Sequence, residues 1–141
     1  MSGTLILGYD ESRSANAALE ACIELAPELD ASVVAVFGYY ITPLGGQGAP
    51  DLRNALVHVG EHALNRAKAD LEAAGIAVTT RLVEGRPADV LLQVANETGA
   101  RMIVVGTEGE NPITGAFLGS VVLRLIHRSS VPLAVIPTAA A

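Results

Sequence analysis

Five short apolar runs alternate with four segments of helical periodicity along this 141-residue chain. The apolar runs are rich in β-branched and aliphatic residues and are bounded by turn residues, which predicts strands over Thr4–Tyr9, Ser32–Tyr39, Ala77–Val83, Arg101–Gly106 and Pro132–Ile136. Helical spacing of apolar residues predicts helices over Ser12–Leu29, Leu52–Ala74, Pro87–Glu97 and roughly Gly119–Arg128. Strict alternation favours parallel strands, right-handed crossovers and helices on both faces. We therefore expect a doubly wound α/β sandwich.

Composition fits one domain and argues against several partners. Half of the residues are hydrophobic, as expected for strands that helices cover on both faces. A chain of 141 residues suits a single domain, which we expect to span residues 1–141. The formal net charge is −6 without a cluster of Lys or Arg, so nucleic acid is not an expected partner. No apolar run reaches the ~18 residues of a membrane helix, and residues 1–3 lack the basic start of a secretory signal. We expect a cytoplasmic protein with no membrane partner.

The segment 102–121 joins a strand candidate to a loop punctuated by glycine. Gly106, Gly109 and Gly119 leave backbone N–H groups unshielded by side chains, as a phosphate-binding loop requires. Ser120 follows at the expected start of the last helix, where its hydroxyl can cap free N–H groups or bond a phosphate oxygen. A glycine triplet alone would indicate a tight turn, so the pattern needs support from the rest of the chain.

The spacing G-x2-G-x9-G-[ST] in this segment resembles the ATP-binding motif of the universal stress protein family at all four fixed positions. The resemblance covers residues 4–137, which would form the core of the domain. It implies a five-stranded, Rossmann-like sheet of the adenine nucleotide alpha hydrolase type with strand order 3-2-1-4-5, which periodicity alone does not choose. In that order strands one and four are neighbours where the order reverses. Asp10 and Gly106 would then face one crevice at the carboxyl ends of the strands.

The resemblance also implies an adenine nucleotide, ATP, as the cofactor, with or without Mg²⁺. The residues expected to bind it are Asp10, Gly106, Thr107, Gly109, Gly119, Ser120 and Val121. Asp10 could accept a hydrogen bond from an adenine amino group or hold magnesium beside the phosphates, although an aspartate here could also simply start the turn before a helix. The sequence leaves open which residue of the second strand, Phe37 or Gly38, would contact a base.

Two acidic residues depart from the family pattern. The variable positions of the glycine loop often hold basic residues in relatives, but Glu108 and Glu110 occupy them here. Two like charges ~6 Å apart at an effective dielectric near 20 repel by about 3 kcal/mol. The carboxylates could point to solvent, magnesium could bridge them to phosphate, or ATP is not the ligand. The alternative function is therefore a dimeric interaction module on the same fold that binds no nucleotide.

A second alternative is a zinc site in the second predicted helix. His58, Glu61 and His62 form an H-x-x-E-H pattern like that of inverted zinc peptidases, and two histidines four residues apart share a helical face. No residue downstream clearly supplies a third ligand, and the family resemblance places this helix away from the crevice. We therefore favour a solvated helix face, with no metal ligand assigned.

A response-regulator receiver domain is a third alternative on a similar fold. Asp10 with the acidic residue after it, and Thr107, mimic receiver residues that follow strands one and four. A receiver also needs an aspartate after strand three and a lysine after strand five. This chain has Glu84 at the first place, and its only lysine is Lys68 in the second predicted helix. The receiver hypothesis therefore lacks two essential residues.

The last predicted strand is a candidate dimer interface. In the implied order, the apolar segment Pro132–Pro137 lies at a sheet edge, where an uncovered strand invites pairing. We expect it to pair antiparallel with its copy in a two-fold homodimer, as the resemblance also implies.

The chain lacks a P-loop GK[ST] lysine and an evident water-activating base. We expect a sensor or regulator in the stress response, with at most slow ATP hydrolysis, and not a dedicated enzyme.

Overall fold

The computed structural model describes residues 3–41, 49–107 and 119–138, and strands and helices alternate throughout them. The strands are β1 (Gly3–Gly8), β2 (Ala31–Tyr39), β3 (Val78–Glu84), β4 (Met102–Gly106) and β5 (Leu133–Ile136). The helices are α1 (Arg13–Glu28), α2 (Ala49–Ala73), α3 (Pro87–Thr98) and α4 (Ser120–Arg128). The predicted elements are therefore confirmed, and the largest shift at a helix start is that α2 begins three residues before Leu52.

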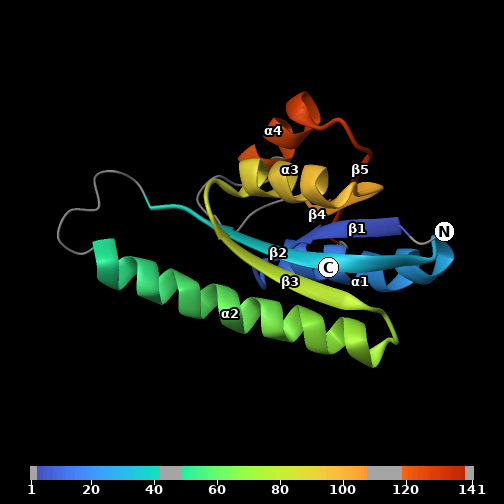
Figure 1. The fold of residues 1–141 in the computed structure, drawn as a ribbon, viewed down its shortest axis with the longest axis horizontal. Coiled ribbons are helices and arrows are strands. Elements are labelled where there is room, and N and C mark those ends of the chain that lie inside the picture. Colours follow the sequence, from blue (N-terminus) through green and yellow to red (C-terminus); the bar gives the residue numbers. More distant parts are fainter. Residues whose placement is uncertain (1–2, 42–48, 108–118, 139–141) are drawn as a thin grey trace.

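The strands form one parallel sheet in the order β3-β2-β1-β4-β5 (Figure 1). β1 lies at the centre, where Leu5 pairs with Val33 of β2 on one side and Met102 of β4 on the other. The chain builds outwards in one direction through β2 and β3, then crosses back to add β4 and β5. This order confirms the doubly wound, Rossmann-like prediction.

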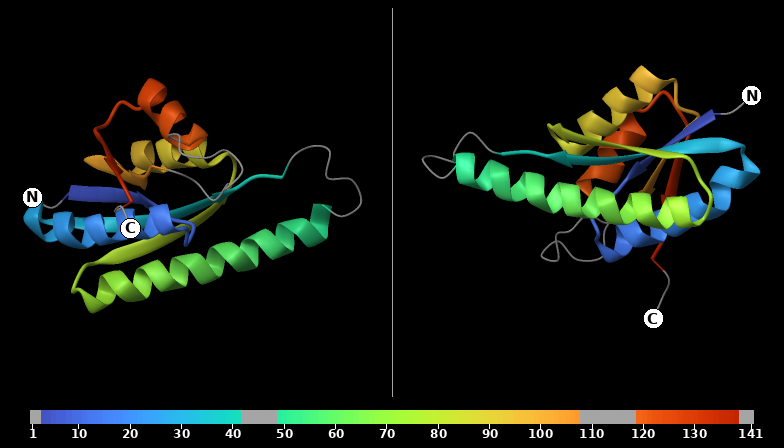
Figure 2. Two further views of the ribbon diagram at one scale, coloured as in Figure 1. Left: turned by 180° about the vertical axis from the view of Figure 1, so that it is seen from behind. Right: turned by 60° about the horizontal axis from the view of Figure 1, so that its bottom comes forward.

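Helices cover both faces of the sheet. α1 and α2 pack on one face, and α3 and α4 pack on the other (Figures 1 and 2). Alternate strand residues point to opposite faces, so Leu5 and Leu7 contact the α1 and α2 side, while Ile6 contacts the α3 and α4 side. All three side chains are fully buried. The central strands are therefore apolar at consecutive positions, as the composition predicted.

Helix α2 approaches the sheet closely at a glycine. A Cβ atom on Gly60 would lie 2.5 Å from Leu82 Cδ1 and 2.7 Å from Phe37 Cδ1, so a larger residue would push the helix off β2 and β3. The N-terminal turns of α2 extend past the carboxyl ends of the strands (Figures 1 and 2). Leu52 and Val59 in these turns are about half exposed.

The edge strand β5 is half-buried along its length. It pairs with β4 on one side, from Ile103 with Leu133 to Gly106 with Ile136. Its other side has no neighbouring strand among the described residues. None of the described helices has the length and apolar character needed to cross a membrane.

Candidate functional site

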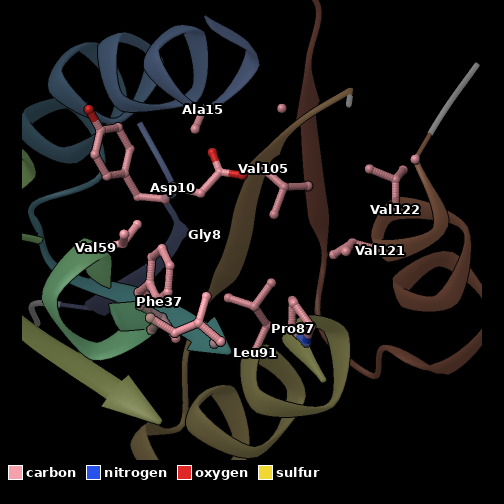
Figure 3. Close-up of a pocket in the computed structure, with 16 residues that line it drawn as sticks. Gly8, Asp10, Ala15, Phe37, Val59, Pro87, Leu91, Val105, Val121 and Val122 are labelled. Atoms are coloured by element: carbon pink, nitrogen blue, oxygen red, sulfur yellow. The ribbon is translucent and has the colours of Figure 1, made fainter. Parts of the chain in front are cut away.

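A pocket of about 350 Å³ lies at the carboxyl ends of the central strands (Figure 3). Its volume falls within the ~300–1,000 Å³ range of small-molecule sites. Gly8 at the end of β1, Gly38 in β2 and Gly106 at the end of β4 all line it. Because the sheet order reverses at β1, this is the position where open α/β sheets bind ligands. The predicted convergence of Asp10 and Gly106 on one crevice is thus present.

The pocket has two unlike ends. Phe37 and Val59 lie on one side, and Val121 and Val122 at the start of α4 lie on the opposite side (Figure 3). The first end is apolar and suits a flat ring, because aromatic and aliphatic side chains offer large contact surfaces without hydrogen-bonding demands. The second end is a helix start, which carries partial positive charge and suits an anion. The arrangement matches a ligand with a ring at one end and a negative charge at the other.

Asp10 starts a turn and also lies at the pocket. Its Oδ1 accepts a hydrogen bond from the Ser12 N–H at 3.0 Å, which forms the turn before α1. Ser12 then caps the helix, because its Oγ accepts a hydrogen bond from the Ala15 N–H at 3.0 Å. Asp10 also lines the pocket, and its carboxylate lies between Ala15 and Val105 (Figure 3). The turn reading of Asp10 is therefore confirmed, and the turn uses one of its two carboxylate oxygens.

Gly106 has a structural role that the motif did not reveal. A Cβ atom there would overlap Ser14 Oγ and lie 2.6 Å from the Ser14 carbonyl carbon. Ser14 belongs to the first turn of α1 and is 4% exposed. Glycine is therefore needed for β4 to contact α1, in addition to lining the pocket.

At the start of α4, the glycine motif is held by a backbone hydrogen bond. The Gly119 N–H donates to the Thr107 carbonyl at 2.8 Å, so this amide is already engaged. Gly119 is the N-cap of α4, and no side chain caps the helix there. Of the two roles open to the Ser120 hydroxyl, N-capping does not apply, because Ser120 is the first helical residue of α4 and Gly119 is the N-cap. The first amides of α4 have no partner within the helix, which leaves them suited to an anion.

The predicted binding residues divide into three groups. Four of them line the pocket: Asp10, Gly106, Gly119 and Val121. Thr107 and Ser120 are described but are not among its lining residues. Gly109 lies outside the described residues, as do the acidic Glu108 and Glu110. Of the two base-contact options, both Phe37 and Gly38 line the pocket.

Helix α2 contributes a wall of the pocket that sequence reasoning missed. Leu56 and Val59 both line the cavity, whereas the expectation placed this helix away from the crevice. That expectation is wrong because α2 runs past the strand ends and approaches β2 at Gly60. The available signal was the lone glycine inside a helical pattern, which often marks close backbone approach.

The histidine-containing segment of α2 contacts the loop after β1. His62 Nδ1 lies 2.5 Å from Glu11 Oε1, in the loop after β1. Arg66 Nη1 lies 3.4 Å from Glu11 Oε2. In the described parts of the chain, no three His, Cys, Asp or Glu residues are grouped as a metal ion would need. The zinc alternative for His58, Glu61 and His62 therefore finds no third ligand among those residues.

Two titratable groups beside the pocket are perturbed for opposite reasons. The hydrogen bond with His62, helped by Arg66, holds the pKa of Glu11 below its usual range despite partial burial. Burial raises the pKa of Tyr9, which is 2% exposed and donates its hydroxyl hydrogen to Asn16 Oδ1 at 2.6 Å. The loop after β1 therefore stabilises an ionised Glu11 and a neutral Tyr9.

Comparison with known proteins agrees with this architecture. Universal stress protein MJ0531 of Methanocaldococcus jannaschii is 30% identical over 94% of this chain and 80% of its own length. The solved structure of protein MJ0577 from the same organism superimposes with a TM-score of 0.86, covering 99% of this chain and 98% of its own, at 21% identity. A universal stress protein solved in complex with cAMP is 30% identical, with a TM-score of 0.67 over 97% of this chain and 98% of its own.

Two further structures share the fold and were solved with nucleotides. One, from Arabidopsis thaliana, has AMP bound and superimposes with a TM-score of 0.73 at 14% identity over 98% of this chain and 93% of its own. The other, from Archaeoglobus fulgidus, is a complex with dAMP, with a TM-score of 0.67 at 21% identity over 96% of this chain and 98% of its own. The model of the universal stress protein family matches residues 1–137. This chain therefore belongs to the universal stress protein family.

Proposed function

We propose that this chain binds an adenine nucleotide, with ATP as the first candidate, and acts as a sensor or regulator of a stress response in the cytoplasm. The observation that carries the proposal is the pocket, which combines an apolar end with a helix start at the reversal point of the sheet. The cAMP complex of a relative with 30% identity supports it, and the AMP and dAMP complexes indicate that the fold accommodates such ligands.

The two ends of the pocket suggest how the nucleotide would lie. The base would pack beside Phe37 and Val59, and the phosphates would face the first turn of α4. The proposed contact residues remain Asp10, Gly106, Thr107, Gly109, Gly119, Ser120 and Val121. Because the Gly119 amide is bonded to Thr107, we assign direct phosphate binding to the amides of Ser120 and Val121. The free oxygen of Asp10 would accept a hydrogen bond from the ligand or hold Mg²⁺.

Titration calorimetry with ATP, with and without Mg²⁺, tests the proposal, followed by AMP and cAMP. Gly119→Val should abolish binding, because the added side chain enters the pocket that Gly119 lines. The variant should still fold, since Gly119 has φ −64° and ψ 160°, which valine adopts readily. Ser130→Val places the same side chain at an exposed residue beyond the other end of α4 and should bind normally. Full binding by the Gly119→Val protein would show that the nucleotide lies elsewhere.

We also propose that the chain folds as one domain over residues 1–141 and forms a two-fold homodimer through Pro132–Pro137. The unpaired side of β5 supports this, because an apolar edge strand offers backbone groups to a second copy. Val135→Lys should convert the dimer to monomer in light-scattering measurements. A dimer that persists in this variant would exclude the proposed interface.

A second candidate function is an interaction module that binds no nucleotide. Leu123 and Ile126, about half exposed on α4, favour it because they give this helix an apolar outer face. The measurement that separates the two functions is nucleotide release. If the first proposal holds, heat denaturation of the purified protein should release bound nucleotide, which is detected by the ultraviolet absorbance of adenine in the supernatant. Absence of released nucleotide, together with no binding of added ATP, would favour the interaction module.

A further inference from the structure

The loop after β1 contains a residue with an unusual backbone conformation. Glu11 has φ 64°, in the left-handed region that favours glycine. Among the described non-glycine residues, only Asp30 shares this property, and it lies in the turn after α1. Glu11 stands between Asp10, which lines the pocket, and Ser12, which caps α1. Such a conformation persists only where surrounding contacts hold it, so the contacts of Glu11 indicate what the loop is for.

The Glu11 carboxylate joins the loop to α2. Oε1 lies 2.5 Å from His62 Nδ1, and Oε2 lies 3.4 Å from Arg66 Nη1. His62 and Arg66 are four residues apart and therefore share one face of α2. On its other side, the loop is held by Asn16, whose Nδ2 donates to the Glu11 carbonyl at 3.5 Å. The conformation of Glu11 is thus fixed from both α1 and α2.

The same helix supplies a wall of the pocket through Leu56 and Val59. Glu11 therefore fastens two sides of one cavity, namely the loop that carries Asp10 and the helix that carries Val59. The charged and titratable groups around this contact are Arg66 and Asp70 of α2, and Tyr9 and Asp10 of the loop after β1.

We propose that His62 and Arg66 are positioning residues for the ligand, which through Glu11 hold Asp10 and α2 at the separation that a bound nucleotide needs. This inference rests on the proposed nucleotide binding. The Glu11 carboxylate contacts both side chains, so the loss of His62 and the loss of the Glu11 carboxylate should weaken the same link between the loop and α2. Nucleotide affinity should therefore fall when either side chain is removed.

The chain offers a matched control for this role. His58 and His62 are exposed histidines one turn apart on α2, but only His62 contacts Glu11. At pH 6, His62→Gln should weaken the Kd for ATP by about fivefold, while His58→Gln should leave it unchanged. Glu11→Gln should weaken the Kd for ATP to a similar extent, and His62→Gln should add little further loss in the Glu11→Gln protein, because both substitutions remove the same contact.

Glu11→Gly separates positioning from a purely structural role. Glycine adopts φ 64° without strain, so a loop that needed only this backbone shape would bind ATP as well as wild type or better. The positioning role predicts weaker ATP binding with an unchanged circular dichroism spectrum. Equal ATP affinity in wild type, His62→Gln and Glu11→Gly would overturn the inference and leave the proposed function intact. A wild-type protein that binds no ATP, AMP or cAMP would overturn both.

Discussion

The loop after β1 and the two glycines that end β4 and precede α4, Gly106 and Gly119, form two sides of one pocket, but they are held differently. Side chains hold the loop: Asp10 accepts from the Ser12 amide, and Glu11 contacts α2 through its carboxylate. Backbone contacts hold the other side, where the Gly119 amide donates to the Thr107 carbonyl. The first side therefore depends on charge, and the second depends on the absence of a side chain.

This difference separates two tasks within one site. A side held by backbone amides can accept anions of different size, because amide donors impose no particular charge pattern. A side held by carboxylates responds to pH, as the lowered pKa of Glu11 indicates, and can select groups that donate hydrogen bonds. Substitutions that change size should therefore act mainly at Gly106 and Gly119. Substitutions that change charge should act mainly at Asp10 and Glu11.

The largest expected effect is on stability at Gly106. Gly106→Ala places a Cβ atom 2.6 Å from the Ser14 carbonyl carbon, and this backbone atom lies in the buried first turn of α1. Relief requires β4 and α1 to separate, which should lower the free energy of unfolding by about 3 kcal/mol. Urea denaturation of wild type and variant, followed by circular dichroism, measures this change in the free energy of unfolding.

Gly3→Ala is the matched control for this substitution. Its Cβ atom would lie 2.7 Å from Arg101 Cγ, a similar approach, but to the flexible stem of an exposed arginine that can move aside. The free energy of unfolding should change by less than about 1 kcal/mol. If both variants lower the free energy of unfolding by the same amount, the β4 side of the pocket does not depend specially on glycine at position 106. The contrast between the two sides of the pocket would then fail at that residue.

Much of this fold could be predicted because its signals are local. The alternation of apolar strands with helical segments needs only neighbouring residues, and fully apolar runs such as Val33 to Phe37 indicate a sheet covered on both faces. The strand order came from the family resemblance, since periodicity does not say which strands are neighbours. Once that order is given, the meeting of Asp10 and Gly106 follows from topology.

The details of the site were harder to predict because they depend on contacts between distant segments. The packing of Gly106 on Ser14 joins residues 92 positions apart, and the contact of Glu11 with His62 joins residues 51 positions apart. No local pattern encodes either one. Gly60 was a usable signal, because an isolated glycine costs stability inside a helix unless close packing requires it. It marks the place where α2 approaches the pocket.

A smaller effect on stability is expected at Tyr9, which lies in the loop after β1 on the side of the pocket that depends on charge. Tyr9→Phe removes the hydroxyl bond to Asn16 and should lower the free energy of unfolding by about 1 kcal/mol at pH 7. Burial raises the pKa of Tyr9, so the neutral phenol stabilises the fold below pH 10, and this contribution is lost as pH rises above 10. The stability gap between wild type and variant should therefore narrow in alkaline urea titrations. Tyr40→Phe, at an exposed tyrosine, is the control. The difference in the free energy of unfolding between wild type and Tyr40→Phe should stay constant from pH 7 to pH 11.

The smallest expected effect is the acid response of Glu11. Its pKa is lowered in the folded protein, so its contribution to stability is present above the usual glutamate pKa of 4.5 and is lost as pH falls below that value. Glu11→Gln should lower the Tm by about 1–2 °C at pH 7 and by less at pH 3, because an exposed ion pair contributes little. Glu61→Gln, at an exposed carboxylate beside His62 in sequence, should match wild type throughout. Scanning calorimetry from pH 3 to pH 7 measures all three proteins. Parallel acid profiles for wild type and Glu11→Gln would mean that the loop after β1 is held by its backbone as well, and the charge-dependent half of the contrast would fail.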